Sequence, residues 1–228
     1  MTEPISVSEA LRRRISTRAF LDRPVSEADV RRLLELASRA PSGGNLQPWH
    51  IHVVTGQARE RVVEAVRAAA AEHPAGEPEL EYNVYPRPLE DPWRTRRFEC
   101  GEAMYGAIGI PRDDKIARLT QFARNMEFFG APVGLFVSLH KSMQPGQWSD
   151  LGMFIQSFLL AAEEAGLASC AQEFWSAFPK AVKAAVGIPD DYTLFCGISL
   201  GHADPDAPVN ATRTSRAGVD EFASFRGF

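Results

Sequence analysis

The order of apolar and polar positions along the 228-residue chain predicts helices separated by short strands. The expected helices span residues 6–14, 26–40, 57–73, 97–107, 112–127, 150–165 and 178–186. The expected strands span residues 49–55, 132–139, 169–174 and 193–201. Two of these strands contain the continuous apolar runs VGLFVSL and TLFCGISL, which are typical of strands covered on both faces. The pattern predicts a three-layer α+β or α/β fold in which helices enclose a small sheet.

Capping residues mark the ends of several predicted helices. Ser26, with Asp29 three residues later, resembles a capping box at the start of the second helix. Ser149 and Asp150 are expected to open the sixth helix, and Gly166 to end it. This sixth helix, DLGMFIQSFLLAAEEA, is apolar around most of its circumference. That pattern is typical of a helix at the centre of a core or in an interface.

A long proline-rich segment, residues 74–96, interrupts the regular pattern. It carries Tyr82, Tyr85 and Trp93 between its prolines. The prolines are Pro74, Pro78, Pro86, Pro88 and Pro92. A loop of this length inside a compact domain is usually a lid or a binding loop. Two interpretations stay open: a lid or arm that embraces a partner, and a structural wrap packed on the body.

The size and charge of the chain narrow its class. Its 228 residues fit one large α/β-type domain over residues 1–228. A net charge of −4 argues against binding to nucleic acid, which needs a large basic excess. The N-terminus has no apolar core like that of a signal peptide, and no stretch is long enough for a membrane helix. Three widely spaced cysteines form no metal or redox pair, so a reduced cytoplasmic protein is expected.

A first polar cluster follows the N-terminal helix, in the sequence RISTRAF. Arg14 and Arg18 are four residues apart, with the hydroxyl of Ser16 between them. Guanidinium groups give forked, charge-assisted hydrogen bonds, so this set is able to grip a phosphate. The alternative is a solvated basic helix end whose charges favour the helix dipole.

A second polar cluster, PSGGNLQPWH, lies between a predicted helix and a predicted strand. Gly43 and Gly44 let backbone N–H groups approach a ligand closely. Ser42, Asn45 and Gln47 offer donors and acceptors to the edge of a heterocycle. The alternative is a plain connecting loop that ends in an X-Pro turn.

Two other patterns suggest chemistry but have simpler explanations. Cys170 resembles a nucleophile with a histidine as base, but it lies in an apolar strand, where an inert buried thiol is expected. The histidines in question are His50, His52, His140 and His202. His50 and His52 point to one face of a strand, yet no third ligand is near in the sequence, so no metal site is predicted.

Taken together, these motifs resemble the nitroreductase family of FMN enzymes. RISTRAF, Pro24-Val25 and PSGGNLQPWHIHVV match the N-terminal signature of that family. The likeness continues with Ala131-Pro132-Val133-Gly134 before a strand, with Gly166-Leu167 before ASCAQE, and with the closing segment from Asn210 to Phe222. The resemblance spans essentially the whole chain and is strongest to the nitrobenzoate-reductase-like branch.

The resemblance implies a fold and a cofactor site. The fold would be a mostly antiparallel central sheet covered by helices, in a homodimer with swapped arms. FMN would be held by four groups of residues. Arg14, Ser16, Arg213 and Arg216 would bind its phosphate and ribityl chain, with Ile15 beside them. Arg18 would lie at the pyrimidine edge, where a cation favours the anionic reduced flavin.

The same resemblance divides the rest of the flavin site between two subunits. Pro41, Ser42, Gly43 and Asn45 would come from the partner. Ala171, Gln172 and Glu173 would border the flavin N5, with the backbone N–H of Glu173 as the donor. The family often has Pro at the position of Ala171 and Gly at that of Phe174, so the local contact departs from the usual pattern.

The implied activity is electron transfer through the flavin. NADH or NADPH would reduce FMN, and a nitroaromatic compound or a quinone would then take the electrons in a ping-pong cycle, with no titratable catalytic side chain. Tyr85, Trp93 and Phe122 would wall the substrate, and Arg124 or Arg87 would meet a carboxylate if the substrate is nitrobenzoate-like.

Alternatives within the same scaffold are dehalogenation and flavin fragmentation. A dehalogenase grips its substrate with acidic, Tyr and Lys residues of a lid, whereas this loop offers Glu81, Tyr82 and Arg87 but no Lys. A flavin-binding protein without turnover is the alternative from a different class.

Overall fold

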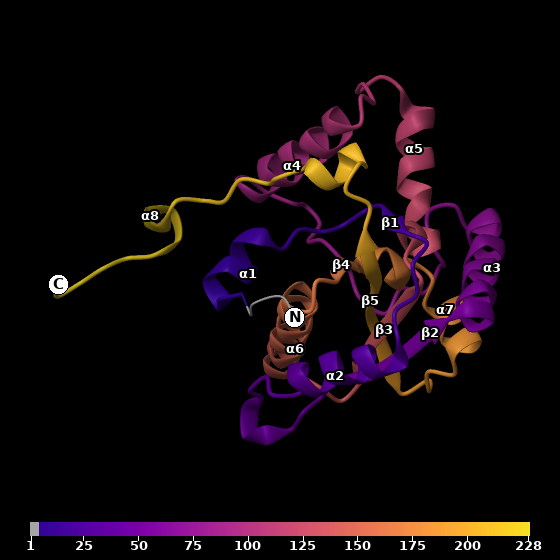
Figure 1. Ribbon diagram of the computed structural model, residues 1–228, viewed down its shortest axis with the longest axis horizontal. Coiled ribbons are helices and arrows are strands. Elements are labelled where there is room, and N and C mark those ends of the chain that lie inside the picture. Colours follow the sequence, from indigo (N-terminus) through magenta and orange to yellow (C-terminus); the bar gives the residue numbers. More distant parts are fainter. Residues whose placement is uncertain (1–4) are drawn as a thin grey trace.

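An antiparallel sheet forms the centre of the computed structural model, which describes residues 5–228 (Figure 1). The strands are β1 (Phe20–Leu21), β2 (His50–Thr55), β3 (Val133–His140), β4 (Ala168–Gln172) and β5 (Tyr192–Ala203). The order is β1-β5-β3-β2, and β4 also pairs with β5. Every pairing between described strands is antiparallel, which confirms the expected mostly antiparallel sheet.

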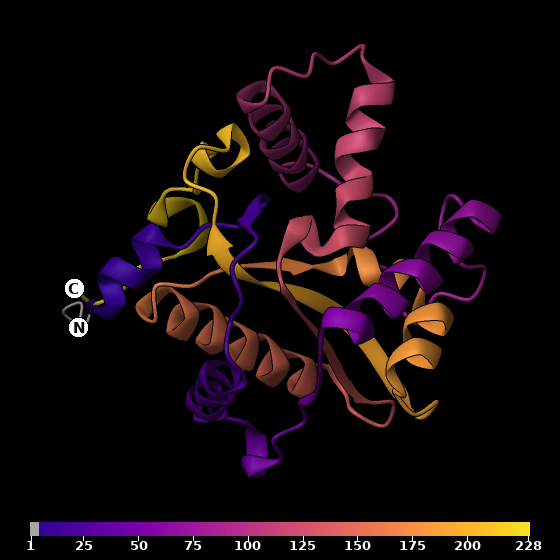
Figure 2. The same cartoon turned by 45° about the vertical axis from the view of Figure 1, so that its right-hand side comes forward.

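Helices cover both faces of the sheet (Figure 2). The helices are α1 (Val7–Arg13), α2 (Glu27–Ala37), α3 (Gly56–Glu72), α4 (Trp93–Ala107), α5 (Lys115–Ala123), α6 (Pro145–Glu164), α7 (Pro179–Val186) and α8 (Val219–Phe222). Short 3₁₀ segments are η1 (Gly43–Asn45), η2 (Arg124–Gly130), η3 (Glu173–Ala177) and η4 (Pro208–Ala211). No helix within residues 5–228 combines the length and apolar character needed to cross a membrane.

The alternation of side chains along β3 divides the core into two parts. Val133, Leu135 and Val137 point to one face, where they pack with residues of α2 and α6. Phe136 points to the other face and packs with Trp175 and with residues of α3 and α7. Seven of the eight residues of β3 are buried, as its continuous apolar sequence predicts.

Helix α6 begins earlier than the sequence pattern predicted. It starts at Pro145 instead of near Asp150, because the backbone N–H of Gln144 donates to the side chain of Gln147 in a capping box. Proline suits the first helical position, since its fixed φ is helical and its missing N–H is not needed there. Helix α4 also begins early, at Trp93, so this residue lies on a helix and not in the preceding loop.

The helix predicted over residues 112–127 is shorter in the structure. Asp114 caps α5 by accepting from the backbone N–H of Ala117 at 2.9 Å. After Ala123 the chain tightens into η2, where Phe128 and Phe129 have φ of 52° and 55°. These left-handed residues end the helix and turn both rings into the core, where they are 0% and 2% exposed.

Two glycines let aromatic rings lie directly on the sheet. A Cβ atom on Gly197 would lie 2.3 Å from Cδ1 of Trp175, and one on Gly134 would lie 2.4 Å from Cζ of Phe128. The two rings are themselves in contact, with centroids 4.3 Å apart. Both residues are fully buried, so neither ring has free space in which to move.

We therefore predict that Gly197→Ala destabilises the protein by about 1–3 kcal/mol or more through overpacking against Trp175. The measurement is the free energy of unfolding from urea denaturation at fixed protein concentration. Gly106→Ala is the matched control, because a Cβ at this helical site meets no atom within 4 Å. The control should be neutral or slightly stabilising, and equal effects of the two substitutions would contradict the packing argument.

Candidate active site

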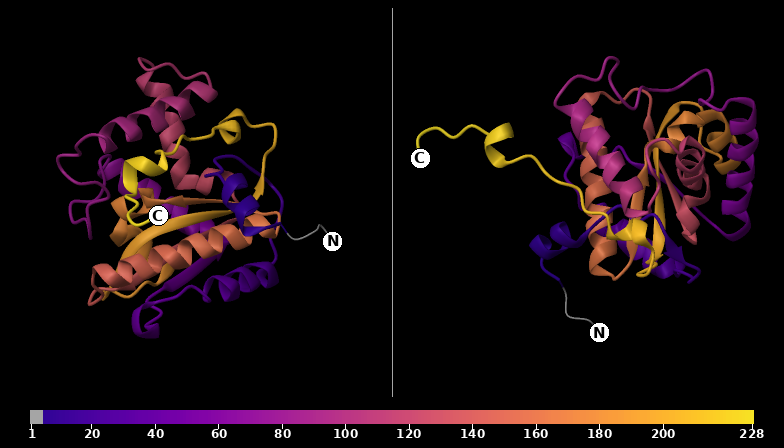
Figure 3. Two further views of the ribbon diagram at one scale, coloured as in Figure 1. Left: turned by 90° about the vertical axis from the view of Figure 1, so that its left-hand side faces the viewer. Right: turned by 90° about the horizontal axis from the view of Figure 1, so that it is seen from above.

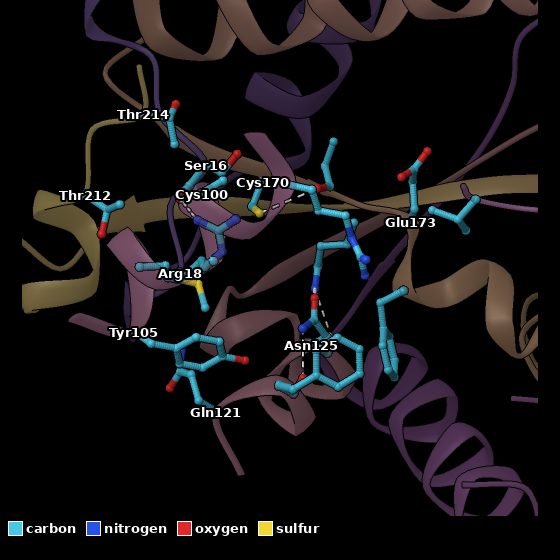
Figure 4. A pocket seen from close by; sticks show the side chains of 18 of the residues that line it. Ser16, Arg18, Cys100, Tyr105, Gln121, Asn125, Cys170, Glu173, Thr212 and Thr214 are labelled. Atoms are coloured by element: carbon cyan, nitrogen blue, oxygen red, sulfur yellow. Dashed lines mark hydrogen bonds between the residues drawn. The ribbon is translucent and has the colours of Figure 1, made fainter. Parts of the chain in front are cut away.

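A cavity of about 1310 Å³ opens between the end of β4, the segment after α1, the C-terminal segment and the helices α4 and α5. Figure 4 shows Ser16, Arg18, Thr212 and Thr214 on one side of it, and Tyr105, Gln121 and Asn125 on another. The edge of the sheet from Cys170 to Glu173 forms its floor. Tyr85, from the proline-rich loop, lies on the roof together with residues of α4.

Backbone contacts fix the segment that carries the first polar cluster. The N–H of Thr17 donates to the carbonyl of Ser169 on β4 at 3.0 Å. The N–H of Arg18 donates to the side chain of Asn210 at 2.8 Å, and the amide group of Asn210 donates to the carbonyl of Ala19. Thr17 is 2% exposed. Because successive side chains of extended backbone point to opposite sides, the side chains of Ser16 and Arg18 point away from the core and line the cavity.

The cavity lining is strongly basic. Eight arginines and only two carboxylates line it. Three of the arginines are neutralised in ion pairs: Arg12 with Glu9, Arg94 with Asp91, and Arg118 with Glu102. The other five take part in none of the ion pairs formed among residues 5–228: Arg14, Arg18, Arg97, Arg213 and Arg216. Such an excess of positive charge favours an anionic ligand.

The residues present fit a phosphorylated flavin. Arg14, Ser16, Arg213 and Arg216 all line the cavity and offer the forked and hydroxyl donors that a terminal phosphate requires. In the described part of the chain, Gln121 Nε2 and Thr212 Oγ1 are buried cavity-wall atoms without a hydrogen-bond partner. Buried polar atoms normally form hydrogen bonds, so a polar ligand in the cavity would give each of these two atoms the partner that it lacks.

At the floor of the cavity, the side chain of Gln172 points away from the cavity and into the core. Its amide nitrogen donates to the backbone and side-chain oxygens of Asn125 at 3.1 and 3.0 Å. Its carbonyl oxygen accepts from Ser199 Oγ and from the indole of Trp175. Gln172 is 4% exposed, so its side chain has a packing role and the floor is formed mainly by the neighbouring backbone and by Glu173.

Cys170 is not placed for nucleophilic catalysis. It lies at the cavity floor but is 3% exposed, and burial raises the pKa of its thiol. No histidine among residues 5–228 lines the cavity to act as its base. His50 and His52 lie beside each other on β2 with ring centroids 4.8 Å apart, and no group of three or more potential ligands in this part of the chain is able to hold a metal.

The first half of the proline-rich loop is anchored to the body. Glu77 accepts from the backbone N–H groups of Lys180 and Ala181 at the start of α7, at 2.7 and 3.1 Å. Glu81 pairs with the buried Lys183 at 2.8 Å and accepts from the N–H of Leu194. Residues 77–82 are therefore a structural wrap packed on the body, whereas residues 84–85 lie at the cavity.

This anchoring matters for the dehalogenase alternative. The hydroxyl of Tyr82 donates to the carbonyl of Phe195, and burial raises its pKa above the ordinary value. Glu81 is occupied by Lys183, as described above. Neither residue lines the cavity, and Arg87 does not line it either. Glu81 and Tyr82 thus hold the loop in place and are not available at the cavity to grip a zwitterionic amino acid.

The structure brings together most, but not all, of the residues expected at the site. Nine of the expected cofactor residues line the cavity: Arg14, Ile15, Ser16, Arg18, Ala171, Gln172, Glu173, Arg213 and Arg216. Pro41, Ser42, Gly43 and Asn45 lie outside it, on a loop between α2 and β2. Of the expected substrate contacts, Tyr85 and Phe122 line the cavity. Trp93, which is 58% exposed, and Arg124 do not.

Several cavity residues were missed by sequence reasoning. Gln121 and Asn125 are one helical turn apart and flank Phe122, so all three reach the cavity from the end of α5. The i, i+4 spacing of two amides beside an exposed aromatic was an available signal. Thr212 and Thr214 lie on either side of Arg213 in the C-terminal segment. Arg97, Cys100 and Tyr105 come from α4 and gave no signal of their own.

The fold and the site define an α+β protein with a basic cavity beside an antiparallel sheet, and comparisons with known proteins place it in a family. The Nitroreductase family model matches residues 11–202. The chain is 37% identical over 219 residues to the nitrobenzene nitroreductase of Ectopseudomonas oleovorans, covering 96% of each chain. It is 34% identical to the 4-nitrobenzoate reductase of Pseudomonas putida, covering 100% of this chain and 98% of that one. The chain belongs to the nitroreductase family.

A solved structure supports the same conclusion. The FMN- and NADPH-dependent nitroreductase NfnB from Sphingopyxis sp. strain HMH superposes with a TM-score of 0.95 at 50% sequence identity, covering 98% of this chain and 100% of that one. This similarity confirms the nitroreductase fold that the motifs implied.

The carboxyl of Glu173 gives a pH-dependent prediction. Burial raises its pKa, so its ionised form is disfavoured in the folded protein. Its contribution to stability is therefore fully present below the unfolded-state pKa and is lost as pH rises through the raised folded pKa. In urea denaturation of FMN-free protein, the stability of Glu173→Gln relative to the wild type should increase from about pH 4 to about pH 8. A difference that stays constant across this range would contradict the argument.

Proposed function

We propose that this protein is an FMN-dependent oxidoreductase that oxidises NADPH or NADH and reduces nitroaromatic compounds, or quinones, in a ping-pong cycle. The observation that carries the proposal is that Arg14, Ser16, Arg213 and Arg216 all line one cavity, and that none of the three guanidinium groups has a carboxylate partner within residues 5–228. The relatives described as nitrobenzene nitroreductase and 4-nitrobenzoate reductase support the choice of electron acceptor.

The residues of the cavity have distinct roles in this proposal. Arg14, Ser16 and Arg216, with Arg213, would hold the FMN phosphate, and Arg18 would set a positive charge beside the ring system. The bound flavin would supply the electron transfer. The segment from Ala171 to Glu173 would lie along the flavin edge, with the backbone N–H of Glu173 as the donor to the flavin N5.

An aromatic wall favours flat, electron-poor rings as substrates. Phe122 and Phe174 meet edge to face, with centroids 5.5 Å apart, and both line the cavity. Tyr85 adds a third ring from the loop. A nitroaromatic ring placed against these side chains would be sheltered from water on the side away from the flavin. The engagement of Glu81 and Tyr82 elsewhere favours nitro reduction over dehalogenation.

We also propose that the protein is a homodimer, located in the cytoplasm, whose partner subunit completes each flavin site. The loop with Ser42 and Asn45 lies outside the cavity of its own chain, yet Asp150 holds it firmly by accepting from the N–H of Gly43 at 3.1 Å. The C-terminal segment runs away from the body (Figure 3) and exposes Phe222 by 71% and Phe225 by 62%. Large exposed apolar side chains of this kind mark an interaction surface.

The first test is the activity of the purified protein. It should be yellow, release FMN but not FAD on heating, and oxidise NADPH in the presence of 4-nitrobenzoate or nitrobenzene. Initial rates at several acceptor concentrations should give the parallel double-reciprocal lines of a ping-pong cycle. A colourless protein that does not take up added FMN would refute the cofactor assignment, and a yellow protein without nitroaromatic turnover would leave it as a flavin-binding protein.

The second test concerns the phosphate site. Arg14→Ala and Arg216→Ala should each weaken FMN binding by about 1.5–3 kcal/mol, the value of a hydrogen bond to a charged group. FMN fluorescence during titration of the apoprotein measures this loss. Arg13→Ala is the matched control, because Arg13 lies outside the cavity and pairs with Glu163 at 3.2 Å on the protein surface. FMN affinity equal to the wild type in both cavity variants would place the phosphate elsewhere.

The third test asks whether the two subunits share each site. In a heterodimer of one Arg14→Ala subunit and one Asn45→Asp subunit, a shared site predicts one unaltered and one doubly altered flavin site. Asp tolerates the left-handed φ of 57° at this position, so the loop should keep its shape. FMN titration should then show one wild-type affinity per dimer and one affinity weaker than that of the Arg14→Ala homodimer. A weak site whose affinity equals that of the Arg14→Ala homodimer, or a monomer that keeps FMN, would contradict the shared site.

A further inference from the structure

The cavity lining contains a cation, Arg97 on α4, that is not among the residues expected to bind FMN. Three arginines of α4 and α5 line the cavity: Arg94, Arg97 and Arg118. Arg94 is neutralised by Asp91, and Arg118 forms two hydrogen bonds to the carboxylate of Glu102 at 2.6 and 3.1 Å. Arg97 takes part in none of the ion pairs formed among residues 5–228.

An aromatic ring orients the free guanidinium group of Arg97. Its Cζ lies 4.4 Å from the centroid of the Tyr85 ring, which is a cation–π contact between α4 and the proline-rich loop. Both residues line the cavity. Stacking uses the face of the planar guanidinium group and leaves its N–H groups, which lie in the plane, free to donate. The contact therefore positions Arg97 without satisfying its hydrogen bonds.

The volume of the cavity leaves room for a second ligand. Its 1310 Å³ exceeds the range of about 300–1,000 Å³ that is typical for a site holding one drug-sized molecule. If FMN lies along the floor with its phosphate at Arg14 and Arg216, the space between the flavin and the roof belongs to the reactant that enters and leaves. Arg97 is a free cation on that roof.

We propose that Arg97, oriented by Tyr85, is an anion-binding subsite for the transient reactant. The group that it binds is a phosphate or a carboxylate: the 2′-phosphate of NADPH or the carboxylate of a nitroaromatic acid. The inference rests on the proposed function and deepens it, because the subsite would select NADPH over NADH or nitrobenzoate over nitrobenzene. Arg97 is a binding residue here and takes no part in electron transfer.

The test compares charged and uncharged members of each ligand pair on the FMN-loaded enzyme. Calorimetry of Arg97→Gln gives dissociation constants for NADP⁺ and NAD⁺, and steady-state kinetics gives KM for 4-nitrobenzoate and nitrobenzene. A subsite for the 2′-phosphate predicts about tenfold or more weaker NADP⁺ binding with NAD⁺ unchanged. A subsite for the carboxylate predicts a similar rise of KM for 4-nitrobenzoate alone. Arg97→Lys should retain part of the selectivity, since it keeps the charge.

Arg112→Gln is the matched control. Arg112 also stacks on an aromatic ring, with its Cζ 5.0 Å from the Phe98 centroid, but it does not line the cavity. It should leave both ligand ratios unchanged. If Arg97→Gln changes neither ratio, or weakens charged and uncharged ligands equally, the subsite is refuted even though the enzyme contains FMN and turns over. A wild-type protein without FMN or turnover would instead refute the proposed function.

Discussion

The buried side chain of Gln172 joins the parts of the molecule that meet at the cavity. Its amide connects β4 to β5 through Ser199, to η2 through Asn125 and to η3 through Trp175. Each donor and acceptor of a buried amide must be satisfied, so the four segments are able to adopt only arrangements that keep these bonds. The floor of the cavity, its aromatic wall and the Trp175 ring on Gly197 therefore depend on one another. Loss of this amide would disturb the site and the core together.

Repulsion between the charges at the cavity has the opposite effect, because it destabilises the folded protein. Five arginines face one cavity without carboxylate partners in residues 5–228, and their mutual repulsion lowers the stability of the ligand-free protein. A bound phosphate removes part of that repulsion and stabilises the folded state by mass action. The backbone contacts of Thr17 with Ser169 and of Arg18 with Asn210 hold the segment that carries Arg14 and Arg18 when no ligand compensates these charges. The family relationship and this charge pattern point to the same cofactor by independent routes.

The sequence was informative where local pattern determines structure. The continuous apolar runs placed β3 and β5 correctly, because a strand covered on both faces has no polar side to show. The start of α6 was misplaced because Pro145 and Gln144 form a cap that resembles a turn in the sequence. The end of α5 was misplaced for a different reason: after Ala123 the chain tightens into η2, in which Phe128 and Phe129 take left-handed conformations with both rings buried.

The sequence also identified only part of the candidate site. Arg14, Ser16 and Arg18 were found because a short motif carries them, and their common direction follows from extended backbone with Thr17 buried. Arg97 carries no motif, and its neighbours Arg94 and Arg96 are indistinguishable from it in sequence. Only the pairing of those neighbours with Asp91 and Glu221, and the stacking of Arg97 on Tyr85, separate one functional cation from two structural ones. A sequence gives the number of arginines in a segment. The function of each arginine depends on whether the fold leaves its guanidinium group without a carboxylate partner.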